Sequence, residues 1–213
     1  MSSLPALSSR TPRRLLVVLL ASLVTAGSAV ARADTAPAAG TSAAGAKASA
    51  VAATPDRARY DVTLRGDSDG SHWTGRQRLS FRNAADRPLR EVYLRLWGNG
   101  DDGCGTPAKP SPVRISRIHG GTPGRLTVGC TALRVTLPRP LAHGARATVA
   151  FDVSIAVPGR NSRFGREGAF RFLGNALPVL AVHDAKGWHL DPYVATGESF
   201  YTLAGDFQVR LDH

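Results

Sequence analysis

TVAFDVSIAVPG, residues 148 to 159, alternates apolar and polar side chains over the longest such run in the chain. Successive side chains of a β-strand point to opposite faces of a sheet, so this alternation predicts a strand with one buried face and one solvated face. Pro158 and Gly159 end the run, as expected for residues that interrupt a strand. The apolar positions are Val149, Phe151, Val153, Ile155 and Val157.

Shorter runs of the same kind occur on both sides of this segment. They cover residues 60–64, 73–81, 94–97, 113–118, 126–128, 133–137 and 207–211, and each is bounded by Gly, Pro, Asn or Asp. No long helical period follows the N-terminal segment. The pattern predicts an all-β protein, either an antiparallel β-sandwich or a curved multi-sheet domain.

The N-terminus has the features of an export signal. Arg10, Arg13 and Arg14 precede an apolar stretch at 15–24, which is followed by Ala31-Arg32-Ala33, a small-x-small cleavage site. We therefore expect a signal peptide over 1–33, a secreted protein beginning at Asp34, and no stable membrane anchor after cleavage. Residues 34–54 are nearly all Ala, Thr, Ser, Gly and Pro, which predicts a disordered linker before one folded domain at 55–213.

The charge of the chain argues against a nucleic-acid partner. The formal net charge is +11, and removing the four arginines of the signal peptide leaves +7. The basic residues are scattered, mostly one to each predicted strand, rather than gathered into a dense block. Solvated strand faces account for them, and weak attraction to an anionic cell wall or membrane remains an alternative.

The chain has two cysteines, Cys104 and Cys130, and both lie in turn-like sequence. In an exported protein such a pair favours a disulfide over free thiols. Two thiolates alone would not complete a zinc site.

Two short motifs resemble parts of serine hydrolases. Gly66-Asp-Ser68-Asp-Gly70 fits the nucleophile elbow, and His119-Gly-Gly121 resembles an oxyanion loop. A nucleophile elbow requires a strand followed by a helix, whereas residues 66–70 join two predicted strands. Hairpin turns use the same residue types, so we expect two turns and no hydrolase site. Asp67 and Asp69 also suggest a calcium loop, but the pattern lacks the later glutamate of such a loop.

A metal site near the C-terminal end is a further hypothesis. The candidate ligands are His183, Asp184, His189, Asp191 and Glu198. Their spacing fits no zinc pattern on a rigid element, and residues 185–187 predict a hairpin turn. We therefore expect no metal here.

The segment Phe172–Val209 carries a resemblance to a known family. It includes FLGNALPVLAV (172–182), GWHLDPY (187–193), GESFY (197–201) and DFQV (206–209), and earlier strands such as YDVTL (60–64) and VYLRLW (92–97) agree. The sequence resembles the N-terminal β-domain of secreted actinobacterial M1 metallopeptidases, the aminopeptidase N-like group, over residues 59–213. The resemblance implies a saddle-shaped β-domain that precedes a thermolysin-like zinc domain.

The family's catalytic motifs are absent from these 213 residues. The chain contains neither His-Glu-x-x-His nor Gly-x-Met-Glu-Asn. We therefore expect no cofactor in this chain, zinc only in the missing catalytic domain, and no catalysis by this chain alone. The resemblance implies that the domain lends a wall to a peptide-binding cleft or an interdomain surface. The residues proposed for that surface are Asn175, Asp191, Tyr193, Glu198 and Tyr201.

Packing at a sheet corner is the alternative role for each of these residues taken singly. The alternative function for the whole chain is a stand-alone secreted β-sandwich module that binds a peptide or another protein. The partner expected from the first interpretation is an M1 catalytic domain.

Overall fold

The computed structural model describes residues 57–213, and in it the alternating apolar residues of the predicted strands form rows of buried side chains. The predicted signal peptide (1–33) and linker (34–54) lie outside the described residues. Apart from one 3₁₀ turn, η1 (Trp97–Asn99), the regular elements are strands, which confirms the all-β prediction. The strands are β1 (Ala58–Gly66), β2 (His72–Arg82), β3 (Leu89–Arg95), β4 (Val113–His119), β5 (Thr122–Thr127), β6 (Ala132–Leu141), β7 (Arg146–Ala156), β8 (Phe164–Glu167), β9 (Phe170–Leu173), β10 (Val179–Leu180), β11 (His183–Asp184), β12 (Gly187–Trp188) and β13 (Gly205–Asp212).

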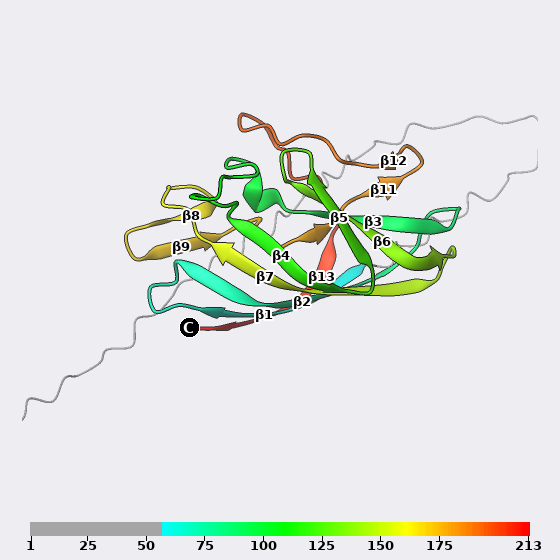
Figure 1. Cartoon of the computed structure of the whole chain (residues 1–213), viewed down its shortest axis with the longest axis horizontal. Coiled ribbons are helices and arrows are strands. Elements are labelled where there is room, and N and C mark those ends of the chain that lie inside the picture. The colour runs from blue at the N-terminus through cyan, green and yellow to red at the C-terminus, as the bar shows by residue number, and fades with distance from the viewer. Residues whose placement is uncertain (1–56) are drawn as a thin grey trace, which may run out of the picture. The chain divides into compact units, whose positions relative to one another are not determined.

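These strands form two main sheets and two small hairpins (Figure 1). The five-stranded sheet has the order β13-β1-β2-β7-β4, and the four-stranded sheet has the order β10-β3-β6-β5. Strands β8 and β9 form one hairpin and β11 and β12 form the other. The turn between β11 and β12 is the one predicted at 185–187.

The hydrophobic core lies between the two main sheets. On β2 and β7, Leu79 pairs with Val149 and Trp73 pairs with Ile155, and all four side chains are buried. The inner residues of β3 and β6 pack against them in the same buried cluster. The period-two pattern therefore identified the core face of the long strands correctly.

One strand pair differs from the expected antiparallel arrangement. β13 lies parallel to β1, with Tyr60 opposite Phe207, and the two rings stack with centroids 4.2 Å apart. Alternation reports which face of a strand is buried and contains no information on strand direction. The phenol oxygen of Tyr60 also accepts a hydrogen bond from the backbone N–H of Leu180, which fixes the chain leaving β10.

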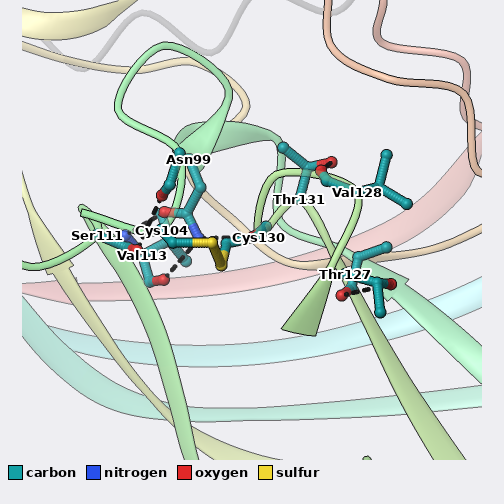
Figure 2. The surroundings of a disulfide bond; sticks show 10 residues. Asn99, Cys104, Ser111, Val113, Thr127, Val128, Cys130 and Thr131 are labelled. Atoms are coloured by element: carbon teal, nitrogen blue, oxygen red, sulfur yellow. Dashed lines mark hydrogen bonds between the residues drawn. A yellow bond between two sulfur atoms is a disulfide. The ribbon is translucent and has the colours of Figure 1, made fainter. Parts of the chain in front are cut away.

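The predicted disulfide joins Cys104 to Cys130 and thereby connects the loop after η1 to the turn between β5 and β6 (Figure 2). Beside it, the buried Asn99 side chain donates hydrogen bonds to the carbonyl oxygens of Val113 and Cys130, each at 3.0 Å. The backbone N–H of Val113 donates to Oδ1 of Asn99 at 2.8 Å. A side-chain bridge and a covalent bridge therefore hold the same region.

Both hydrolase-like motifs are turns, as expected. Ser68 is an exposed residue of the turn between β1 and β2, which the Gly70 N–H closes by donating to the Asp67 carbonyl. Gly120 lies between β4 and β5, where an added Cβ would stand 2.1 Å from the carbonyl oxygen of Thr148. Gly120 also has a φ of +86°, so close approach and backbone conformation both favour glycine there.

No helix within residues 57–213 is both long enough and apolar enough to cross a membrane.

Candidate functional site

The five residues proposed for a cleft or interdomain surface lie around one buried indole, that of Trp97. Asp191, Glu198 and Tyr201 line an open depression of about 450 Å³. Asn175 and Tyr193 line a second, smaller depression of about 170 Å³. Trp97 and Gly197 contribute to both depressions, so the two adjoin. We call this region the Trp97 site.

Arg95 and Trp97 form the floor of the Trp97 site. The Arg95 guanidinium lies 3.7 Å from the centroid of the Trp97 ring, and both side chains are buried, at 1% and 5% exposure. Burial lowers the pKa of Arg95 to about 10, while the Asp191 carboxylate acts in the opposite direction. Arg95 therefore stays protonated at neutral pH, and the cation–π contact stabilises it where water is excluded.

The irregular segment 189–204 forms the rim, and three contacts hold it. Nη2 of Arg95 donates to the backbone carbonyl of Asp191 at 2.8 Å. The Ser199 hydroxyl accepts from the Val194 N–H at 2.7 Å and donates to the Val194 carbonyl at 3.0 Å, closing a local loop. The Glu198 carboxylate pairs with Arg163, with N and O 3.2 Å apart.

Aromatic rings line the boundary between the two depressions. Phe200 packs edge-on against Trp97, with ring centroids 5.6 Å apart, and lies 5.9 Å from Tyr193. The Tyr193 ring covers Gly100, where an added Cβ would stand 2.5 Å from ring carbon atoms. Glycine at position 100 is therefore a requirement of this packing. Burial, together with a hydrogen bond to the Asp101 carboxylate, raises the pKa of Tyr193.

Asn175 occupies a backbone position that few residue types adopt. Its φ is +60°, in the left-handed region, where Asn is among the more tolerated non-glycine residues. The Ala176 N–H donates to the Leu173 carbonyl and closes the turn. The left-handed backbone conformation explains why the residue at position 175 is Asn. The Asn175 side chain lies at the edge of the smaller depression.

The two carboxylates of the Trp97 site are equally exposed. Asp191 and Glu198 have side chains that are each 79% exposed, so solvent screens their charges. Tyr201 is 52% exposed and its ring packs edge-on against His189 at 5.2 Å. The site therefore combines two exposed carboxylates with the Arg95 and Arg163 guanidinium groups and several aromatic rings, and Glu198 is already paired with Arg163. The exposed ring surface suits apolar side chains of a ligand.

The histidines considered as metal ligands have other partners. His189 Nε2 lies 2.7 Å from the Asp184 carboxylate, and that hydrogen bond lowers the pKa of Asp184. His183 packs edge-on against Trp188. Within residues 57–213 no group of three or more His, Cys, Asp or Glu side chains is placed to hold a metal ion. The residues described here therefore do not fit a zinc centre.

Sequence reasoning missed Arg95, Trp97 and Arg163 as parts of the site. The alternation at 94–97 predicts that Arg95 faces solvent, whereas it is among the most buried side chains of the described chain. An arginine two positions before a tryptophan, at the point where a strand ends, is the local signal that could have suggested a stacked pair.

Comparisons with known proteins give limited overlap. No family model matches the chain, and no curated protein matches it. Among solved structures, the M1 zinc metallopeptidase from Deinococcus radiodurans aligns with 48% of this chain at 21% identity and a TM-score of 0.35. A mutant of that enzyme bound to the substrate Tyr-Ser-Ala aligns with 50% at 22% identity and the same TM-score. An exo-β-N-acetylglucosaminidase mutant from Vibrio harveyi aligns with 47% at 14% identity and a TM-score of 0.28.

The aligned part of this chain spans 21% of the length of the two metallopeptidase chains.

Proposed function

We propose that this chain is the exported N-terminal β-domain of an M1-type zinc aminopeptidase, non-catalytic alone, which forms one wall of a peptide-binding cleft with a separate catalytic domain. The observation that carries the proposal is the gathering of Asn175, Asp191, Tyr193, Glu198 and Tyr201 around Trp97. Four of the five come from the segment 191–201, and Asn175 comes from the turn that follows β9, so the site joins two parts of the chain.

The chemistry of the Trp97 site is consistent with a role in peptide binding. The α-ammonium group is assigned to the exposed Asp191 carboxylate, because Glu198 is paired with Arg163, and the exposed ring of Tyr201 accepts an apolar side chain. The chain itself supplies no metal-activated water, because the sequence lacks His-Glu-x-x-His. Hydrolysis is therefore assigned to the partner domain, which also holds the zinc.

Two exposed apolar side chains lie in the site itself and support a docked partner. Val194 and Tyr201 line the larger depression and are each about half exposed. Such surface usually marks an interface when it is contiguous. The occupant assigned here is the catalytic domain of an M1 peptidase.

The test supplies that catalytic domain in trans. The purified chain is mixed with the separately produced zinc domain of an M1 aminopeptidase, and complex formation is measured by calorimetry alongside hydrolysis of a fluorogenic aminoacyl amide. Tyr201→Ala and Glu198→Ala should weaken the complex and lower the gain in activity.

Matched controls come from the tip of the β8–β9 hairpin. Phe170 is 56% exposed, close to the value for Tyr201, and Glu167 is likewise exposed. Phe170→Ala and Glu167→Ala should leave both readouts unchanged. Stoichiometric zinc in the isolated chain, with turnover abolished by His189→Ala, would overturn the proposal.

The second candidate is the stand-alone β-sandwich module, and the same exposed side chains favour it. A module of this kind binds peptide without a catalytic domain. Calorimetric titration with a tripeptide, of the isolated chain and of its complex with the zinc domain, separates the two candidate functions. Equal affinity for the tripeptide in both titrations supports the stand-alone module. Binding that is detected only in the complex supports a cleft formed by the two domains together.

A further inference from the structure

Arginines that are scattered along the sequence gather on one face of the folded chain. The outer face of the five-stranded sheet consists of the residues that alternate with the buried ladder on β1, β2, β4, β7 and β13. We call it the outer sheet face, and the five-stranded sheet that carries it is the lower layer in Figure 1. Its arginines are Arg59, Arg65, Arg76, Arg78, Arg82, Arg114, Arg117, Arg146 and Arg210, and all are exposed.

Acidic residues on the same face are fewer. Asp61, Asp152, Asp206 and Asp212 oppose nine arginines, a formal excess of five positive charges on one sheet face. Both Arg76 and Arg117 pair with the single Asp152 carboxylate, so that carboxylate does not neutralise both. The excess is therefore a property of this face, and it supplies much of the positive charge of the domain.

Four of these arginines have unused hydrogen-bonding groups. Within residues 57–213, the structure gives no hydrogen bond or ion pair to the side chains of Arg65, Arg78, Arg114 and Arg210. They lie on four different strands of the sheet. With neighbouring strands about 4.8 Å apart, the five strands span about 19 Å, so these guanidinium groups are spread across the face rather than clustered at one point.

The chemistry of the outer sheet face narrows the class of partner. Guanidinium groups bind phosphate oxygens through paired hydrogen bonds. None of the large apolar side chains exposed within residues 57–213 belongs to this face, so it has no Phe, Tyr or Trp ring for stacking nucleic-acid bases and no apolar anchor for a bilayer; its exposed rings are the imidazoles of His72 and His119. Only Phe207 comes from the same sheet, and it points to the opposite side, against Tyr60.

We propose that the outer sheet face binds a linear, base-free polyanion of phosphate groups, which lies across the strands and contacts Arg78, Arg114 and Arg210. Binding is electrostatic and does not depend on sequence or on the Trp97 site. Each arginine–phosphate contact releases condensed counterions, so affinity falls as salt rises.

The experiment measures binding of the purified chain to fluorescently labelled inorganic polyphosphate by anisotropy over a range of salt concentrations. The triple variant Arg78→Gln/Arg114→Gln/Arg210→Gln should bind at least tenfold more weakly. The logarithm of affinity should fall against the logarithm of salt with a slope smaller by about 2 in the variant than in the unchanged protein, at about 0.7 per lost contact.

The control variant is Arg87→Gln/Arg90→Gln/Arg139→Gln, which removes the same charge from exposed positions outside the outer sheet face. It should bind polyphosphate within about twofold of the unchanged protein, because screening confines the effect of a charge to about 10 Å. Equal losses in the two triple variants would show that net charge alone drives binding and would overturn the proposal.

Two other probes decide the class of partner. Single-stranded oligothymidylate of matched length and vesicles of equimolar phosphatidylcholine and phosphatidylglycerol should bind more weakly per phosphate than polyphosphate. The proposal would be overturned if either probe bound more tightly than polyphosphate and if that binding was lost in the Arg78→Gln/Arg114→Gln/Arg210→Gln variant. The partner of the outer sheet face would then be nucleic acid or a membrane surface.

Discussion

Removing the Cys104–Cys130 disulfide should lower the free energy of unfolding by about 3.5 kcal/mol, because the unbridged chain gains entropy when it unfolds. The bridge joins residues that are 26 positions apart. Loop entropy for that length gives about 12 cal/mol/K, which corresponds to the stated free energy at room temperature. The perturbation is the double variant Cys104→Ala/Cys130→Ala.

The folded state should survive this change, because Asn99 connects the same region through its side chain. Its hydrogen bonds to Val113 and Cys130 keep the loop after η1 near the turn between β5 and β6 (Figure 2). The double variant should therefore unfold in a single cooperative transition. Asn99→Ala alone should cost about 2–4 kcal/mol, since it leaves buried backbone groups without partners.

The assay is equilibrium unfolding in urea, followed by tryptophan fluorescence. With a slope of about 2 kcal/mol per molar urea, the midpoint of the double variant should fall by nearly 2 M. A midpoint within about 0.3 M of the unchanged protein would refute the entropic reasoning. Combining Asn99→Ala with the double variant should cost more than the sum of the separate effects, because each bridge compensates for loss of the other.

Three further variants test the packing and the ionisable groups. Gly75→Ala should cost at least about 3 kcal/mol in thermal unfolding, because the new Cβ would stand 1.9 Å from the Thr63 carbonyl oxygen on the neighbouring strand. Burial of the Asp102 carboxyl raises its pKa, yet hydrogen bonds from two basic side chains outweigh that effect and lower the pKa. The stability that Asp102 adds is therefore present above pH about 4 and is lost as pH falls through the folded-state pKa. The difference in free energy of unfolding between Asp102→Asn and the unchanged protein should therefore shrink on acidification. Burial lowers the pKa of His183, so the unfolded chain binds the His183 proton before the folded chain does as pH falls below about 6.5, and the free energy of unfolding falls with it. In His183→Gln this decrease below pH about 6.5 should be smaller.

The sequence predicts the long strands well because burial there follows the period of a β-strand. Val149, Phe151 and Ile155 each meet a buried partner on β2, so local alternation and long-range packing agree. The β8–β9 hairpin was not predicted, since glycines at 165 and 168 interrupt any sustained alternation. Parallel pairing of β13 was also missed, because side-chain pattern is the same in either direction.

The Trp97 site was predictable only in part. The resemblance selected Asp191, Tyr193 and Glu198, and the structure brings them to adjoining depressions, while their role in binding stays a prediction. The burial of Arg95 could not be inferred from its neighbours, because a charged residue between two leucines normally faces water. Its environment depends on Asp191, which is distant in the sequence and joins it only after folding.

The parallel pairing of β13 with β1 joins the first and last strands of the described chain. Ala58 faces Gly205, so the edge of β1 that does not pair with β2 is covered only by the last strand. Contacts of such long sequence separation require closure of a large loop and are typical of slowly folding proteins. During that delay the backbone edge of β1 stays open to pairing with other chains, which makes it the point where aggregation competes with folding.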